Sequence, residues 1–192
     1  MHSRRRLSEA VSEGQAISLL VSVAGAGEAS AAEAAGAEAV ATEGIVDDVR
    51  AATALPILVM GSTPEEAEAS GADAWLLVAE EEGDGLEQRH SLAGNLGLEC
   101  VVDARDEEEL EAVLARIDPE IVLLSPRDAE REEDAVDHVL ELLPDVPAGM
   151  LVIAELRSPT HEDLLALERA GVDAALVGPG DVASLVRGRA SL

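Results

Sequence analysis

The sequence predicts an α/β fold, a compact (β/α)8 TIM barrel with short βα loops, and three observations support this prediction. Eight short apolar runs recur along the 192 residues, and helical patterns separate them. The runs barely alternate with polar residues, which is typical of parallel strands buried on both faces. Glycines after the helical segments mark where the chain turns back into the next strand. A doubly wound open sheet is the alternative.

The expected strands are short, so each unit of one strand and one helix is small. Shared over eight units, 192 residues leave about 24 residues for each, whereas such barrels usually have ~250 residues in all. Few residues therefore remain for long loops that could cover a site. The expected strands cover residues 17–23, 37–42, 56–61, 74–79, 99–104, 121–125, 150–156 and 174–178.

Four helix-to-strand joints share one pattern, in which a glycine precedes a small or apolar residue, an acid and then a strand. The glycine can adopt the positive φ that ends a helix, after which the chain enters the sheet. These joints lie within residues 34–44, 69–81, 95–104 and 169–180.

Three helix starts are predicted from capping residues. Thr63 precedes a proline and two acids, and Asp106 precedes Glu109 at the spacing of a capping box. Ser158, which precedes Pro159, is the third predicted start.

The charge of the chain argues against several classes of partner. It has 40 acidic residues against 13 basic ones, all of them arginine, for a formal net charge of −27. Such a field repels nucleic acids and anionic membrane surfaces, so we expect neither as a partner. Cys100 is the only cysteine, which allows no internal disulfide and fits a cytoplasmic location.

One barrel domain is predicted over residues 16–192, preceded by an N-terminal helical extension over residues 1–15. The first residues are basic, as in an export signal, but mostly polar residues follow, so we expect no secretion. The apolar runs are far shorter than a membrane span.

Three stretches carry a resemblance to a known family. They read LGLECVVDARDEEELEAVL (96–114), IVLLSPRD (121–128) and VIAELRSPTHEDLLALERAGVDAALVG (152–178). In this order they resemble indole-3-glycerol phosphate synthase, a ribulose-phosphate-binding barrel of tryptophan biosynthesis. The resemblance implies that RRRLSEAV near the N-terminus is the remnant of a helix that precedes the first barrel strand.

The family reaction closes an indole ring with loss of CO₂ and water, and it uses lysines on the first and third strands. The resemblance places those lysines near Ser22 and at Met60 of this chain. It also implies that Asp103 replaces a glutamate of the family, that Ser125 replaces an asparagine, and that Glu155 is unchanged. This chain contains no lysine. We therefore expect that the synthase reaction, which needs a lysine as proton donor, has been lost.

A small phosphorylated or anionic ligand is the expected partner, at the carboxyl ends of the strands where barrel sites lie. Backbone amides of Gly178 and Gly180 follow the eighth strand and precede a short helix, where they could meet an anion. Arg127 and Arg157, after the sixth and seventh strands, would add positive charge. The alternative for the glycines is a tight strand-to-helix turn.

Asp103 and Glu155 are the candidate catalytic residues, because both should point inward near the carboxyl ends of their strands. The alternative is that they pair with Arg105, Arg127 or Arg157 inside a narrow barrel. His161, in the first turn of a helix, is expected to be solvated.

No cofactor and no metal are predicted, since the four histidines lack metal-ligand spacing. Cys100 is expected to be a buried thiol and Trp75 a core residue.

Three hypotheses for function remain open. The chain could be a repurposed relative of the synthase that binds a small ligand at the barrel mouth. It could be a scaffold or interaction protein that kept the fold alone. It could also be a lyase or isomerase of altered mechanism that uses Asp103 and Glu155.

Overall fold

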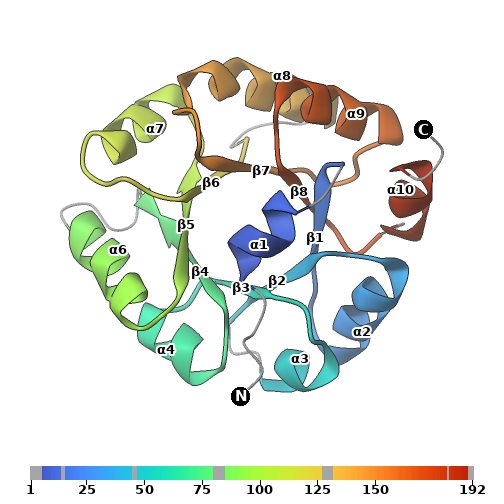
Figure 1. Ribbon diagram of the computed structural model, residues 1–192, viewed down its shortest axis with the longest axis horizontal. Coiled ribbons are helices and arrows are strands. Elements are labelled where there is room, and N and C mark those ends of the chain that lie inside the picture. The colour runs from blue at the N-terminus through green and yellow to red at the C-terminus, as the bar shows by residue number, and fades with distance from the viewer. Residues whose placement is uncertain are drawn as a thin grey trace.

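Eight parallel strands close into a barrel in chain order, and β8 pairs with β1 to complete the ring. The computed structural model describes residues 6–13, 16–44, 47–79, 85–126, 132–180 and 182–189. Figure 1 looks along the barrel and shows the helices ringing the outside of the strands. The predicted (β/α)8 barrel is therefore confirmed, and the open sheet is excluded.

Each strand overlaps one predicted apolar run, although β2 continues one residue further, to Glu43. The strands are β1 (Ser18–Ser22), β2 (Ala39–Glu43), β3 (Ile57–Met60), β4 (Ala74–Val78), β5 (Glu99–Ala104), β6 (Ile121–Leu124), β7 (Leu151–Glu155) and β8 (Ala174–Val177).

The helices alternate with the strands along the chain. They are α1 (Leu7–Ser12), α2 (Ala26–Ala35), α3 (Asp47–Ala52), α4 (Pro64–Ala69), α6 (Leu86–Asn95), α7 (Glu107–Leu114), α8 (Glu132–Leu142), α9 (His161–Ala170) and α10 (Val182–Arg189), with a 3₁₀ turn, η2 (Leu143–Asp145). Within the described ranges, no helix has the length and apolar character needed to cross a membrane.

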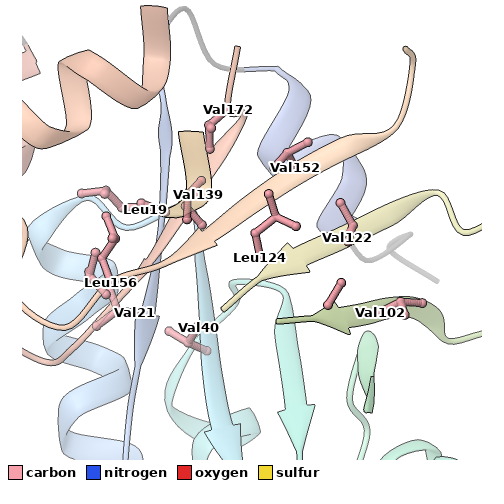
Figure 2. Close-up of a cluster of buried hydrophobic side chains, with 14 of the residues drawn as sticks. Leu19, Val21, Val40, Val102, Val122, Leu124, Val139, Val152, Leu156 and Val172 are labelled. Carbon is pink, nitrogen blue, oxygen red and sulfur yellow. The ribbon is translucent and has the colours of Figure 1, made fainter. Parts of the chain in front are cut away.

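Alternate residues of each strand pack into two separate cores. Outward side chains pack beneath the helices, as Figure 2 shows for Val122 and Leu124 of β6 together with Val139 of α8. Inward side chains, such as Leu20 and Leu58, fill the barrel itself. Alanine occupies four of these inward positions, where its small side chain fits the limited space inside a narrow ring. They are Ala39, Ala41, Ala74 and Ala174.

The acids of the joint pattern bind backbone amides at the amino ends of the strands. Glu38 accepts a hydrogen bond from the amide of Leu19 at 2.8 Å. Asp73 does the same for Ile57 at 3.0 Å, and Asp173 accepts from Val152 at 2.8 Å. In each case the amide belongs to the strand that precedes the acid in the chain. The pattern seen in the sequence therefore satisfies backbone donors that would otherwise lack an acceptor.

The fourth acid of this pattern, Glu99, instead holds α1 across the amino end of the barrel. Its carboxylate accepts from the amide of Leu7 at 2.5 Å and pairs with Arg6 at 3.1 Å. At the other end of α1, the hydroxyl of Ser18 donates to the carbonyl of Val11 at 3.1 Å. Leu7 and Val11 join the interior core, and Figure 1 shows α1 lying over the centre of the ring.

The predicted division into residues 1–15 and 16–192 stays a prediction. Residues 1–5 and 14–15 lie outside the described part of the chain. Of the predicted extension, the structure describes residues 6–13, which contain α1.

Two of the three predicted helix caps are confirmed, and one is wrong. Thr63 accepts from the amide of Glu66 at 3.3 Å, and Asp106 accepts from that of Glu109 at 2.9 Å. The helix predicted to start at Ser158 begins at His161, because Thr160 forms the capping box with the third helical residue.

Substitution of Asp173 tests the role of the joint acids. Asp173→Ala removes the acceptor for the half-buried amide of Val152 and should cost about 1 kcal/mol of unfolding free energy. Asp173→Asn keeps a carbonyl acceptor and should cost less. Urea unfolding of both variants measures the difference, and equal losses would contradict the role.

The same variants carry a pH dependence. Burial raises the pKa of Asp173 above its ordinary value of 3.8, against the lowering effect of its hydrogen bond from Val152. A raised folded-state pKa stabilises the fold at acid pH, and that contribution is lost as the pH rises through the folded value. Wild type should therefore lose stability relative to Asp173→Asn as the pH rises from below 3.8 towards neutrality.

Candidate functional site

The last inward-facing positions of six strands, β2 to β7, form the wall of a cavity of about 650 Å³ at the carboxyl end of the barrel. Residues two positions apart in a strand face the same side of the sheet, so these residues share the inward side with the interior core beneath them. The wall residues that lie within one position of a strand end include Glu43, Met60, Val78, Asp103, Ser125 and Glu155. The loop between β3 and α4 contributes Gly61, Ser62, Thr63 and Glu66.

Asp103 is buried in this wall and fully engaged. The Nε atom of Arg105 donates to one carboxylate oxygen at 2.9 Å, and the hydroxyl of Ser125 donates to the other. The backbone of Arg105 is itself held, since its amide donates to Glu109 at 2.9 Å and its carbonyl lies 2.8 Å from Nε2 of His138. These contacts fix both the carboxylate and the guanidinium that faces it.

Glu155 has a different environment at the end of β7. Although the residue as a whole is exposed, the protein around its carboxyl group raises the pKa through desolvation, and the negative charge of Asp103 raises it further. Arg105 and Arg157 oppose this effect. The wall therefore holds two acids of unlike character, one paired and one in an environment that disfavours its charge.

The β3–α4 loop forms a polar rim beside Trp75. The indole Nε1 of Trp75 donates to the carbonyl of Ser62 at 2.8 Å, which fixes the ring against the loop. Hydrogen bonds from the backbone and then the side chain of Thr63 lower the pKa of Glu66. The Oγ atom of Ser62 is shielded from solvent and has no hydrogen-bond partner in the described part of the chain.

The structure brings the two predicted catalytic acids, Asp103 and Glu155, to the same cavity. The three predicted ligand residues that the structure describes do not line this cavity. Arg157 and Gly178 do not line this cavity, and Gly180 lines a separate one of about 190 Å³ beside α2 and α10. Arg127 lies outside the described residues. The roles given to all of these residues stay predictions.

Gly178 has a packing reason of its own. A Cβ atom at this position would lie 3.1 Å from the carbonyl oxygen of Arg157, so the glycine allows the segments after β7 and β8 to approach closely.

Other singled-out residues fall outside the cavity or are part of the packing. His161 is half-buried rather than solvated, and its Nδ1 is a buried atom without a hydrogen-bond partner among the described residues, so that expectation is wrong. Cys100 packs against the outer core, and burial raises its thiol pKa to about 12, as expected of an inert thiol. Trp75 is 2% exposed, as expected of a core residue, and it also lines the cavity. No group of three or more His, Cys, Asp or Glu side chains in the described ranges could hold a metal ion.

Sequence reasoning missed several contributors to the wall, Glu43 and Ser62 among them, and one residue that supports it. Glu43 shares the inward phase of Ala41, so the strand period could have found it. Ser62 carried no signal, because it lies in a loop. His138 lies 33 residues from the carbonyl that it contacts, and no local pattern links the two.

A family model and the curated relatives point to one family. The model of the family "Indole-3-glycerol phosphate synthase" matches residues 57–186. A curated protein of that name from Shouchella clausii is 32% identical over 139 residues, which are 69% of this chain and 54% of the relative. Another from Geobacillus sp. is 33% identical over 141 residues, 70% of this chain and 55% of the relative. The chain spans about half the length of the curated relatives it matches.

Solved structures with the same fold have other names. The N-acetylmannosamine-6-phosphate 2-epimerase of Clostridium perfringens has a TM-score of 0.76 and 19% identity, and the match covers 100% of this chain and 97% of that one. A thiamine phosphate pyrophosphorylase from Pyrococcus furiosus has a TM-score of 0.67 and 15% identity, over 90% of this chain and 95% of that one. Likeness at this level of identity shows the fold alone.

Substitution of Asp103 tests the electrostatic link between the two acids. Asp103→Asn removes a negative charge that raises the pKa of Glu155, so that pKa should fall towards its ordinary value of 4.5. An NMR titration of the Glu155 side-chain carboxyl carbon measures the change. Glu43→Gln is the control, because Glu43 is not among the charges that shift this pKa. An unchanged Glu155 pKa in Asp103→Asn would contradict the link.

Proposed function

Because the chain belongs to the indole-3-glycerol phosphate synthase family, we propose that it is a divergent member that no longer closes the indole ring and that binds a small molecule at the barrel mouth. The absence of lysine from all 192 residues carries the first part of this proposal. The cavity at the strand ends supports the second part.

The loss of the ring-closing reaction follows from proton chemistry. Met60, which the resemblance places at the third-strand lysine of the family, lines the cavity, and a thioether has no proton to donate. Ser22, aligned near the first-strand lysine, ends β1 with a hydroxyl group. Arginine cannot replace lysine as a proton donor, since its pKa stays above about 12 in proteins.

Ligand binding is supported by the size and the mixed lining of the cavity. Its volume of about 650 Å³ lies in the range of small-molecule sites, roughly 300–1,000 Å³. Leu76 and Leu123 give the wall an apolar part, while the acids and Ser125 give it polar groups that could orient a ligand. The sequence suggests a phosphorylated or anionic ligand, which would bind through Arg127, Arg157, Gly178 and Gly180. None of these four is among the described residues that line this cavity.

We place this function in the cytoplasm, because a single free thiol suits a reducing compartment. The net charge of −27 disfavours nucleic acids and anionic membrane surfaces as partners.

A second candidate function is acid–base catalysis as a lyase or isomerase. The observation that favours it is the unlike pair of acids, since Asp103 is held by Arg105 while Glu155 has a raised pKa. Two carboxyl groups in unlike environments can serve as base and acid in one reaction.

An assay for indole glycerol phosphate tests the loss of the synthase reaction. The purified protein should form none above the uncatalysed background, while the Geobacillus relative, assayed in parallel, serves as the positive control. Fluorescence of the indole product follows the reaction. Rapid product formation by this chain would sink the proposal.

A proton-exchange experiment tests the second candidate. If Glu155 abstracts protons, incubation with phosphorylated ketoses in D₂O should exchange the proton beside the carbonyl, and NMR would detect the exchange. Glu155→Gln should abolish it, because an amide is not a base at neutral pH. Absence of exchange in wild type, or exchange that survives in the variant, would argue against catalysis by this residue.

A further inference from the structure

We propose that the cavity at the barrel mouth binds a small organic cation, an amine with an apolar body, rather than an anion. This inference rests on the proposed ligand-binding function and names the chemical class of the ligand.

The first argument is the charge of the described wall. Four carboxylates line it, from Glu43, Glu66, Asp103 and Glu155, against the single guanidinium of Arg105. That guanidinium donates to Asp103 at 2.9 Å, so these two charges largely offset each other. Arg157, which is not part of the lining, also acts on Glu155, but the described wall keeps an excess of carboxylates, which repel a phosphate or carboxylate group and attract an ammonium group.

Two of these carboxylates have the capacity to bind a ligand. Glu43 and Glu155 end β2 and β7, and the carboxylate of neither forms a hydrogen bond or an ion pair with another described residue. The raised pKa of Glu155 agrees with this, because the positive charges near it do not offset the desolvation of its carboxyl group and the charge of Asp103. An ammonium group at either carboxylate would supply hydrogen-bond donors and a compensating positive charge.

The second argument is independent of charge. The Oγ atom of Ser62, in the same wall, is shielded from solvent without a hydrogen-bond partner among the described residues. Shielded polar atoms without a partner are rare in folded proteins, and a bound water or ligand is one explanation for such an atom. The hydroxyl oxygen can accept a hydrogen bond from an N–H group of an amine.

The apolar part of the wall defines the body of the ligand. Met60, Leu76, Val78 and Leu123 line the cavity together with Trp75. These side chains make no hydrogen bonds to a fully hydrated ion. They favour binding of a hydrocarbon group, because its apolar surface leaves water on binding. A compact aliphatic amine satisfies both parts of the wall.

Fluorescence of Trp75 can report binding directly. The chain has one tryptophan and no tyrosine or phenylalanine, so all emission comes from this cavity wall. The probes are cyclohexylamine, cyclohexanol and cyclohexanecarboxylate, which share one ring and differ in charge, together with inorganic phosphate. Cyclohexylamine should give a saturable change with an affinity about tenfold or more above that of cyclohexanol, as expected for one hydrogen bond to a charged group. The carboxylate and phosphate should give no saturable change.

Two double variants locate the effect. Glu43→Gln with Glu155→Gln removes two charges from the wall and should weaken cyclohexylamine binding about tenfold or more. Glu107→Gln with Glu111→Gln changes the net charge equally on the exposed face of α7 and should leave the affinity nearly unchanged. Thermal unfolding of both variants checks that the fold is retained.

Each other outcome overturns the inference. Saturable binding of phosphate or the carboxylate without the amine would assign the opposite charge class, while ligand binding at the mouth would stand. Equal weakening of amine binding in both double variants would mean that the bulk charge of the protein, and not the wall, attracts the amine. If no probe binds, the cation site and the ligand-binding function both fail, and a scaffold role gains support.

Discussion

A closed parallel barrel presents backbone amides at the amino ends of its strands, and burying them without acceptors would cost more free energy than a protein of this size can spare. In this chain, the carboxylates of Glu38, Asp73 and Asp173 accept from amides at the start of the preceding strands. The glycines before them adopt positive φ, which turns each helix end so that the acid reaches the edge of the ring. The repeated glycine-and-acid pattern is therefore a requirement of the backbone and not a functional motif.

The two ends of the barrel have different tasks. At the amino end, α1 is held by Glu99 and Ser18, and it adds Leu7 and Val11 to the interior core. At the carboxyl end, the interior core gives way to the cavity. The barrel architecture favours a packed amino end and an open carboxyl end. Residues at the carboxyl ends of the strands can vary without disturbing the layers of side chains inside the barrel.

The fold could be predicted from the sequence because its signals are local. Apolar runs, glycine stops and two of the three caps each depend on residues within one or two turns of chain. The site was only partly predictable, since strand phase placed Asp103 and Glu155 inward but gave no sign of the contact between His138 and Arg105. The cap at Thr160 was misplaced because two serine or threonine residues near Pro159 compete for the role, and only the capping box with Asp163 decides between them.

The separation of frame and wall has a consequence for how such a protein changes over generations. The joint acids and α1 that hold the ring lie at the amino end of the barrel, away from the strand-end positions where its relatives are expected to carry lysine. A lineage can therefore exchange those positions one at a time and inherit an intact barrel at every step. The frame of the barrel therefore sets few limits on which side chains stand at its mouth.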